Sequence, residues 1–500
     1  MELDFSSQSH FLLALLPEIV LSVWGMIVLV AGVWKKEGGP SADDLGILSL
    51  LGILLAGGAN GWLYSVTQTG GDGMILVDRF HLFANWIFLL AGALSILISM
   101  AYVTRQGLQA AETYSLMLFA MVGMMMMVAT QNLMIVFLGL EVMSIAIYAL
   151  AAMNRRDQKS AEAGLKYFLL GAFSTGFFLY GIALVYGATG SVNIAVVARA
   201  TLEGAVVAPL LLFGVAFLAI GFGFKVAAVP FHMWTPDVYE GAPAPITAFM
   251  ATGVKAAAFL AFLRVFMVAF DSLYETWYPI LWWLAAVTMV VANLIALVQP
   301  NVKRMLAYSS IAHAGYLLVA LVAANEMASS AMLFYLLVYT LMNIGAFGIV
   351  IAVAHQGEDR LQMEDYGGLG WQQPMLGVFF TIFLLSLAGF PGTGGFMGKI
   401  FLLQGAVDSD LWTLAIILVM TTLFSYWYYL RVVWYMWMRE ASSADAHTFV
   451  IAAFPMRVAL FVSVGLILYL GVFPGALLGF AQASVESVTQ FGGMFASLIP

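Results

Sequence analysis

The sequence predicts an all-α polytopic membrane protein with about fourteen transmembrane helices. Of its 500 residues, 63% are hydrophobic and only 9% are charged, and the mean hydropathy is +0.97. Soluble folds do not bury so much apolar surface with so few charges. The apolar residues also gather in runs of about 20 or more, the length that crosses a bilayer. We expect one membrane domain over residues 1–500, because no connection is long enough to form a second.

Fourteen apolar runs are long enough to be transmembrane spans. The first follows Glu2 and Asp4 rather than a basic region and is too long for a signal peptide, so we expect it to be a retained span. The runs cover approximately residues 11–34, 45–66, 77–102, 113–130, 132–153, 163–188, 207–238, 243–270, 277–298, 303–323, 328–354, 374–404, 409–438 and 452–480.

Basic residues predict how the spans are oriented. Only Arg79 and Arg199 flank connections that follow even-numbered spans. Cytoplasmic connections of membrane proteins are enriched in Lys and Arg, so both termini should lie on the outer side. The eleven basic residues at connections after odd-numbered spans are Lys35, Lys36, Arg105, Arg155, Arg156, Lys159, Lys303, Arg304, Arg360, Arg439 and Arg457.

Four ionisable side chains lie deep inside apolar runs: Glu141, Lys225, Lys255 and Lys399. A charge at the bilayer centre costs about 2.5 to 3.5 kcal/mol on insertion scales, so such residues are functional candidates. The first three, together with His313, fall near the middle of their spans. Lys399 should lie between the middle and the outer side. We therefore expect a polar row parallel to the membrane plane.

Two spans contain residues that interrupt a helix. Pro230 lies in the run 207–238, and Pro391 lies among several glycines in the run 374–404. Irregular backbone at membrane depth persists only where it is packed in protein or lines a wet cavity. Paired broken helices are typical of inverted-repeat transporters. Because the two spans are five apart, we expect inverted repeats at 113–270 (helices 4–8) and 277–438 (helices 9–13), after helices 1–3 (1–105) and before helix 14 with its tail (452–500).

Simpler roles are open for several of these side chains. Arg264 and Arg431, near span ends, should extend toward the membrane surface, and Lys166 could do the same. Glu141 and Lys225 could form a structural ion pair.

The histidines are open to two readings. His313 could be an ordinary interior histidine or a proton relay, and the same two roles are possible for His232.

The chain has no cysteine, which excludes thiolate iron–sulfur clusters, and its six histidines lack a paired metal-ligand spacing. We expect no cofactor and no metal in this chain.

Four motifs resemble the Mrp-antiporter-like membrane subunits of respiratory complex I. They are Leu138–Ser144 around Glu141, Gly164–Gly176 around Lys166, Phe224–Pro245 from Lys225 through His232, and Asn301–Tyr316 around His313. The resemblance covers nearly the whole chain. Two features set the chain apart from the subunit L and subunit M types: it ends soon after span fourteen without the long lateral helix of the L type, and it has Lys399 where the M type has Glu.

The resemblance implies a proton channel with the Mrp antiporter-like fold, driven by redox chemistry elsewhere. In this family the residue matching Glu141 faces that matching Lys225, Lys166 lies nearby, Lys255 is the central relay and Lys399 lies on the exit side. FMN and iron–sulfur clusters, with NADH oxidation and quinone reduction, would belong to partner subunits.

The implied partners are the membrane subunits of types M, L, K, J, A and H, with lipid, protons and water but no nucleic acid. The location would be the bacterial cytoplasmic membrane, with both termini periplasmic. Movement of Glu141 relative to Lys225 would push the proton toward Lys255, then past His313 to Lys399.

Other functions share parts of this pattern. A subunit of an Mrp-type sodium/proton antiporter, or of a membrane-bound hydrogenase or formate-linked complex, would have the same fold and much of the row. A carrier of organic anions would need a substrate cavity faced by Arg or by a positive helix end. A structural scaffold is the remaining alternative.

Overall fold

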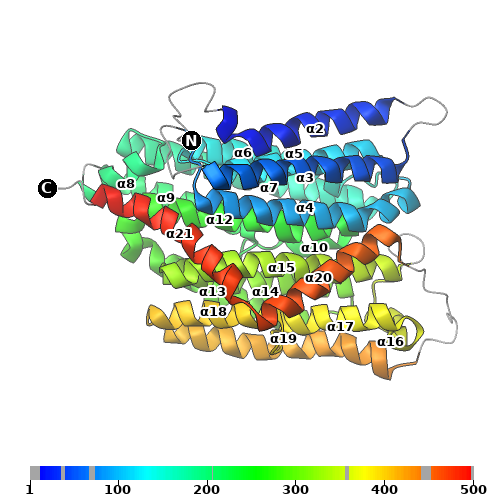
Figure 1. Cartoon of the computed structure of the whole chain (residues 1–500). Helices are drawn as coiled ribbons and strands as arrows, with labels where there is room; N and C mark the ends of the chain where they lie inside the picture. Colours follow the sequence, from blue (N-terminus) through cyan, green and yellow to red (C-terminus); the bar gives the residue numbers. More distant parts are fainter. Residues whose placement is uncertain are drawn as a thin grey trace.

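The computed structural model describes residues 12–34, 40–66, 74–204, 206–354, 360–440 and 452–496, whose regular elements are helices. Thirteen helices in these ranges are long and apolar enough to cross a membrane. Most of them lie side by side in Figure 1. The predicted class, an all-α polytopic membrane protein, is confirmed.

The described chain forms three N-terminal helices, two larger sets and a C-terminal pair. The N-terminal helices are α2 (Leu16–Val33), α3 (Ala42–Val66) and α4 (Arg79–Gln106). The first set is α5 (Ala110–Val128), α6 (Leu133–Ala151), α7 (Gln158–Thr189), α8 (Ile194–Leu202), α9 (Ala208–Val226), α10 (Trp234–Gly241), α11 (Ala244–Phe249), η1 (Met250–Val254) and α12 (Lys255–Ala269). The second set is η2 (Asp271–Leu273), α13 (Tyr274–Leu297), α14 (Val302–Ala323), α15 (Glu326–Val353), η3 (Met363–Tyr366), α16 (Leu369–Gln372), α17 (Pro374–Ala388), α18 (Gly394–Asp408) and α19 (Trp412–Met438), followed by α20 (Phe454–Val472) and α21 (Gly475–Ala496).

Both predicted helix interruptions occur. Helix α9 ends at Val226, where Ala227 adopts a left-handed conformation (φ 62°), and Pro230 lies in the segment that precedes α10. Helix α17 ends before Gly389 (φ 88°), a conformation that glycine adopts without steric cost. The side chain of Thr393 then caps the start of α18.

Three predicted spans differ from the structure because breaks divide them. The spans predicted at 207–238 and 374–404 are each two helices, and α17 and α18 have 15 residues each, too few to cross alone. The last predicted span, 452–480, ends at Val472. Pro474 cannot continue α20, and α21 begins after it at an angle (Figure 1).

The span predicted at 243–270 contains an interruption that the sequence did not predict. Residues Met250–Val254 form a π-helical turn directly before Lys255. Such turns inside α-helices are frequent at functional sites.

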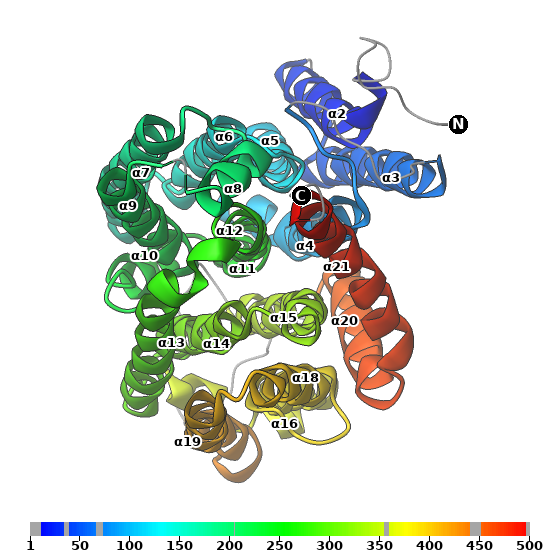
Figure 2. The same cartoon turned by 90° about the vertical axis from the view of Figure 1, so that its left-hand side faces the viewer.

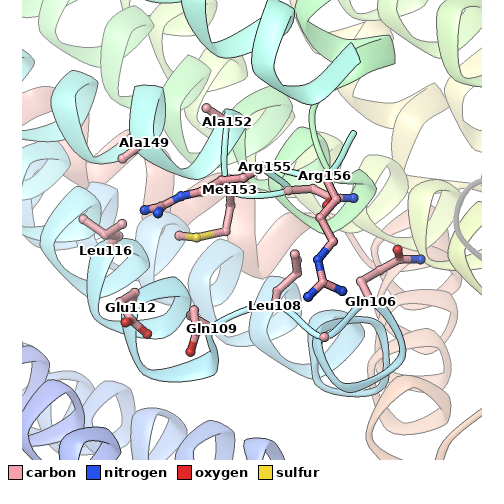
Figure 3. A pocket seen from close by; sticks show the side chains of 12 residues that line it. Gln106, Leu108, Gln109, Glu112, Leu116, Ala149, Ala152, Met153, Arg155 and Arg156 are labelled. Atoms are coloured by element: carbon pink, nitrogen blue, oxygen red, sulfur yellow. The ribbon is translucent and has the colours of Figure 1, made fainter. Parts of the chain in front are cut away.

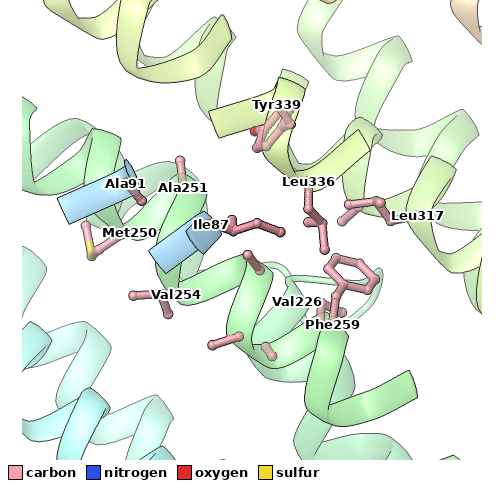
Figure 4. Packing of buried hydrophobic residues seen from close by; sticks show 14 of the residues in the cluster. Ile87, Ala91, Val226, Met250, Ala251, Val254, Phe259, Leu317, Leu336 and Tyr339 are labelled. Carbon is pink, nitrogen blue, oxygen red and sulfur yellow. The ribbon is translucent and has the colours of Figure 1, made fainter. Parts of the chain in front are cut away.

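The core is formed by the spans that carry the central part of the row. The segment Ala244–Ala269 is wholly enclosed, and α14 and α15 are almost so, whereas α2 and α20 are largely exposed. Figure 2 shows α12, α14 and α15 inside the bundle and α2, α20 and α21 at its edge. Figure 4 shows apolar side chains, among them Ile87, Phe259 and Leu336, packed between these helices.

The two ends of the bundle can be told apart by where its first and last described helices begin and end. Helix α2 begins and α21 ends at the same end, on the left in Figure 1. Lys35 and Lys36, used to predict the orientation, lie outside the described residues.

Candidate functional site

Lys225 lies in the last turn of α9, directly before the first break. Its side chain is buried, and Nζ donates a hydrogen bond to Ser144 Oγ on α6 (2.7 Å). Nζ also lies 5.3 Å from the ring centre of Tyr148 and 5.4 Å from that of Tyr167. Two aromatic faces and a hydroxyl therefore stabilise the ammonium group.

Glu141 lies on α6, one turn before Ser144. Neither hydrogen bond of the Lys225 ammonium goes to Glu141; the acceptors are Ser144 and, at 3.5 Å, Tyr148. Glu141 Oε1 is buried and has no hydrogen-bond partner. The structure therefore places the carboxylate beside the lysine's acceptor, without direct contact with the lysine.

Lys255 is the first residue of α12, directly after the π-helical turn. Its Nζ donates to the backbone oxygen of Ser310 (2.7 Å) and to Ser310 Oγ (2.5 Å) on α14. The three row lysines, Lys225, Lys255 and Lys399, are only 3%, 2% and 5% exposed. They therefore form a set of buried amines on three different helices.

His313 lies one turn beyond Ser310 on α14, inside a group of tyrosines. Its Nδ1 lies 2.6 Å from the hydroxyl of Tyr335, and its Nε2 lies 3.2 Å from the hydroxyl of Tyr429. Tyr429 also hydrogen-bonds to Ser309, the neighbour of Ser310. Hydroxyl and imidazole groups can both donate and accept, so these contacts can pass a proton.

Lys399 lies in the second turn of α18, and its side chain reaches back across the second break. Its Nζ donates to the backbone oxygens of Leu387 (3.0 Å) and Ala388 (2.9 Å), the last residues of α17. Carbonyl groups at a helix C-terminus lack intrahelical partners and carry partial negative charge. Lys399 therefore lies at the break itself.

Lys166 lies on α7, at the end of the bundle that carries most of the basic connections. Its Nζ pairs with Glu162 Oε1 (2.6 Å) and Asp237 Oδ2 (2.9 Å), and Arg304 also contacts Asp237. Burial raises the pKa of the Asp237 carboxyl, but its hydrogen bonds and the charges of Lys166 and Arg304 lower it more, so the net pKa is below the ordinary value. These side chains line a pocket of about 180 Å³.

Aromatic rings separate Lys166 from Lys225. Tyr167, the residue after Lys166, stacks on Trp234 with ring centres 4.3 Å apart, and its ring centre is 5.4 Å from Lys225 Nζ. His232, in the segment between α9 and α10, is partly exposed, and its buried Nδ1 has no hydrogen-bond partner. The structure thus brings neither Lys166 nor His232 into hydrogen-bond contact with the row.

The prediction that Arg264 extends to the membrane surface is wrong. Its Nη2 pairs with Asp78 Oδ1 at 2.8 Å, and both side chains are buried. The partner is the residue that caps α4 and is 186 positions away, so no local pattern could indicate this pair. Arg431 donates to the backbone oxygen of Leu297 at the end of α13.

A pocket outside the row lies among the described residues of α4 to α7. It measures about 640 Å³ and is bounded by the connections between α4 and α5 and between α6 and α7. Figure 3 shows Arg155 and Arg156 at its rim, with Glu112 and Leu116 on the facing helix. None of the row lysines lines it. Within the described ranges, His, Asp and Glu side chains form no group of three that could hold a metal ion.

Residues 130–425, more than half of the chain, match the family described as NADH:quinone oxidoreductase/Mrp antiporter, transmembrane. NADH-quinone oxidoreductase subunit N of Trichlorobacter lovleyi is 47% identical, over 95% of this chain and 97% of its own length. The chain belongs to this family, in its subunit N branch. Subunit N 2 of Koribacter versatilis is 45% identical, with the same coverage. The resemblance found in the four motifs is thus confirmed.

Solved structures agree with this assignment. A chain of respiratory complex I from Thermus thermophilus with bound aureothin has a TM-score of 0.79 and 34% identity, covering 94% of this chain and all of its own. A chain of the Mrp complex from Dietzia has a TM-score of 0.83 at 19% identity, covering 98% of this chain and 99% of its own. The second likeness concerns the fold alone, and both agree with the predicted antiporter-like fold.

Proposed function

We propose that this chain carries protons across the membrane as a subunit of NADH:quinone oxidoreductase, along the row from Lys225 through Lys255 to Lys399. The proposal rests on the hydrogen-bond acceptors of the three lysines. Each of the three buried ammonium groups donates to a hydroxyl or a backbone carbonyl oxygen. A neutral acceptor holds an ammonium charge less firmly than a carboxylate does, so the proton can leave.

The groups between Lys255 and the second break support transfer along the row from Lys255 toward Lys399. Ser310 accepts from Lys255, its neighbour Ser309 contacts Tyr429, and Tyr429 contacts His313. Water would complete the row where side chains do not touch. We propose that Lys399 then passes the proton outward from the break between α17 and α18.

Glu141 supplies the electrostatic control in this proposal. Its Oε1 is buried without a hydrogen-bond partner, one helical turn from the acceptor of Lys225. An approach of this carboxylate would hold the proton on Lys225, and its withdrawal would release the proton toward Lys255. Moving one proton against the membrane potential costs about 2.3 kcal/mol per 100 mV, which a buried charge pair can supply.

The finer assignments of location and partners are also proposals. We propose that the membrane is the bacterial cytoplasmic membrane, with both termini periplasmic and the Lys166 pocket at the cytoplasmic entrance. FMN, iron–sulfur clusters and the quinone site would belong to partner subunits, and the membrane partners would be of types M, L, K, J, A and H. Relatives above 40% identity named as NADH-quinone oxidoreductase subunits favour this function over a sodium/proton antiporter subunit.

Replacement of Lys255 in the intact complex tests the proposal. Lys255→Met keeps most of the side-chain volume but cannot bind a proton. We expect the number of protons pumped per NADH to fall while the complex still assembles. The matched control is Arg199→Met, because Arg199 is 70% exposed and lies outside both the row and the Lys166 pocket. An unchanged ratio in an assembled Lys255→Met complex would remove Lys255 from the path.

A further inference from the structure

A second buried polar cluster lies outside the lysine row. It joins Glu18 on α2, Asp78 before α4, His81 on α4 and Arg264 on α12, and all four side chains are buried. His81 Nε2 lies 3.2 Å from Glu18 Oε1, and Arg264 Nη2 lies 2.8 Å from Asp78 Oδ1. Asp78 Oδ1 also accepts from the backbone N–H of His81 at 2.7 Å. Three helices are therefore tied together by ionisable groups.

The cluster lies near the end of the bundle where α2 begins and α21 ends, the predicted outer side (Figure 1). Glu18 is in the first turn of α2, and Asp78 is the residue that caps α4. Arg264 follows Lys255 by nine residues on α12, about two and a half helical turns, so the two side chains leave opposite faces. Lys255 contacts α14, whereas Arg264 contacts α4.

The contacts of His81 Nε2 require two alternative protonation states. The same nitrogen lies 3.2 Å from a carboxylate oxygen of Glu18 and 2.9 Å from the amide nitrogen of Asn85. A protonated Nε2 donates to Glu18 but cannot accept from Asn85. A bare Nε2 accepts from Asn85 but leaves nothing to donate to ionised Glu18. The two arrangements differ in which ring nitrogen of a neutral His81 carries the proton, or by one added proton where both nitrogens are protonated.

The cluster also has unused hydrogen-bonding atoms. Within the described residues, Glu18 Oε2, Asp78 Oδ2, His81 Nδ1 and Arg264 Nε are buried without a hydrogen-bond partner. Buried polar groups are normally paired, and a partly satisfied network is costly. A purely structural tie between helices would gain stability by pairing these atoms or by replacing them with apolar side chains.

We propose that Glu18 and His81 form a second proton-binding site, near the predicted outer end of the bundle, whose occupancy controls proton movement at Lys255 through α12. This inference rests on the proposed function of the row. A proton bound at the pair places positive charge beside Asp78 and weakens its hold on Arg264. Arg264 ties the outer part of α12 to Asp78, and the proposed shift of that helix would act at the π-helical turn directly before Lys255. High proton concentration outside would thus slow pumping.

The other charged groups around the pair lie toward the surface. Arg79, next to Asp78, stacks over the ring of Tyr64 on α3 (5.8 Å), and Glu486 on the neighbouring α21 is exposed. The neighbour that α3 contributes inside the cluster is the uncharged Asn60, which accepts from Asn85. The charged groups inside the cluster are therefore Glu18, His81, Asp78 and Arg264.

The test uses the whole complex in inverted membrane vesicles, whose lumen corresponds to the outer side. The initial rate of NADH-driven proton uptake is measured at lumen pH values from about 5 to about 8, the range in which imidazole titrates. Between these limits we expect the wild-type rate to change about five-fold or more, the small end of coupling between distant sites. In Glu18→Gln, which keeps the side-chain shape, the rate should not depend on lumen pH beyond the effect of the gradient.

Two further variants make the test decisive. Asn85→Leu removes the donor that stabilises the bare nitrogen, so the midpoint should move to higher lumen pH; this variant replaces Glu18→Gln should that variant fail to assemble. A wild-type pH profile in an assembled Glu18→Gln, or an unchanged midpoint in Asn85→Leu, would overturn the proposal and leave the cluster as a structural tie. Lys255→Met separates the two proposals, because normal pumping in that variant would contradict the function of the row itself.

Discussion

Asp78→Asn offers a quantitative test of the buried ion pair between α4 and α12. The asparagine can still cap α4, as Asp78 does for the His81 N–H, but it no longer carries the charge that pairs with Arg264. Both side chains are buried, at 0% and 3% exposure. Removing one partner of such a pair costs about 3–5 kcal/mol, because the other charge is left uncompensated.

The double variant Asp78→Asn/Arg264→Gln distinguishes pairing from other effects. It removes both charges, so we expect it to recover most of the stability lost in Asp78→Asn. The assay is the thermal stability of the fluorescently tagged chain in detergent, followed by size-exclusion chromatography, for the wild type, both single variants and the double variant. Strictly additive losses would refute the reasoning, because they would mean that the two charges do not interact.

Three further changes act on the row and its breaks. Ser144→Ala removes the hydroxyl that accepts from Lys225, a loss of about 1.5–3 kcal/mol. The rate of NADH-driven proton uptake should therefore fall about ten-fold or more. Tyr335→Phe removes the hydroxyl beside His313 and should slow pumping about two- to ten-fold, while Tyr335→Trp tests whether volume alone matters. Gly389→Ala forces a left-handed alanine at φ 88° and should destabilise the chain by about 1–2 kcal/mol, measured as a lower thermal midpoint.

The sequence best predicted those residues whose free-energy cost in a membrane can be judged without knowing which residues they contact. A lysine inside an apolar run, such as Lys225 or Lys255, is expensive wherever the helix packs, so its depth in the run indicates function. Pro230 and the glycines around Pro391 likewise determine the backbone locally, and both breaks occur where they were predicted.

Contacts between distant segments could not be predicted in the same way. Arg264 near a span end looked like a surface residue, because Asp78 is 186 positions away in the sequence. Tyr335 and Tyr429 lie in apolar runs, where tyrosine is equally typical of packing or of the membrane interface. Only the fold brings both hydroxyls to His313.

The position of Lys399 also could not be predicted from the sequence alone. The glycine-rich stretch left its position open between the middle and the outer side. In the structure, two hydrogen bonds to the final carbonyl groups of α17 hold the ammonium group at the break. The length of the unwound segment depends on packing, because glycine permits many conformations.

The claim that the buried lysines form one path is tested most directly by combining two replacements. Lys255→Met, Lys399→Met and the double variant are compared in the intact complex by the number of protons pumped per NADH. On a single path, replacement of either lysine already interrupts proton transfer. The double variant should therefore pump no fewer protons than the more impaired single variant. A double variant whose loss equals the combined losses of the single variants would contradict the account, because each lysine would then serve a separate path.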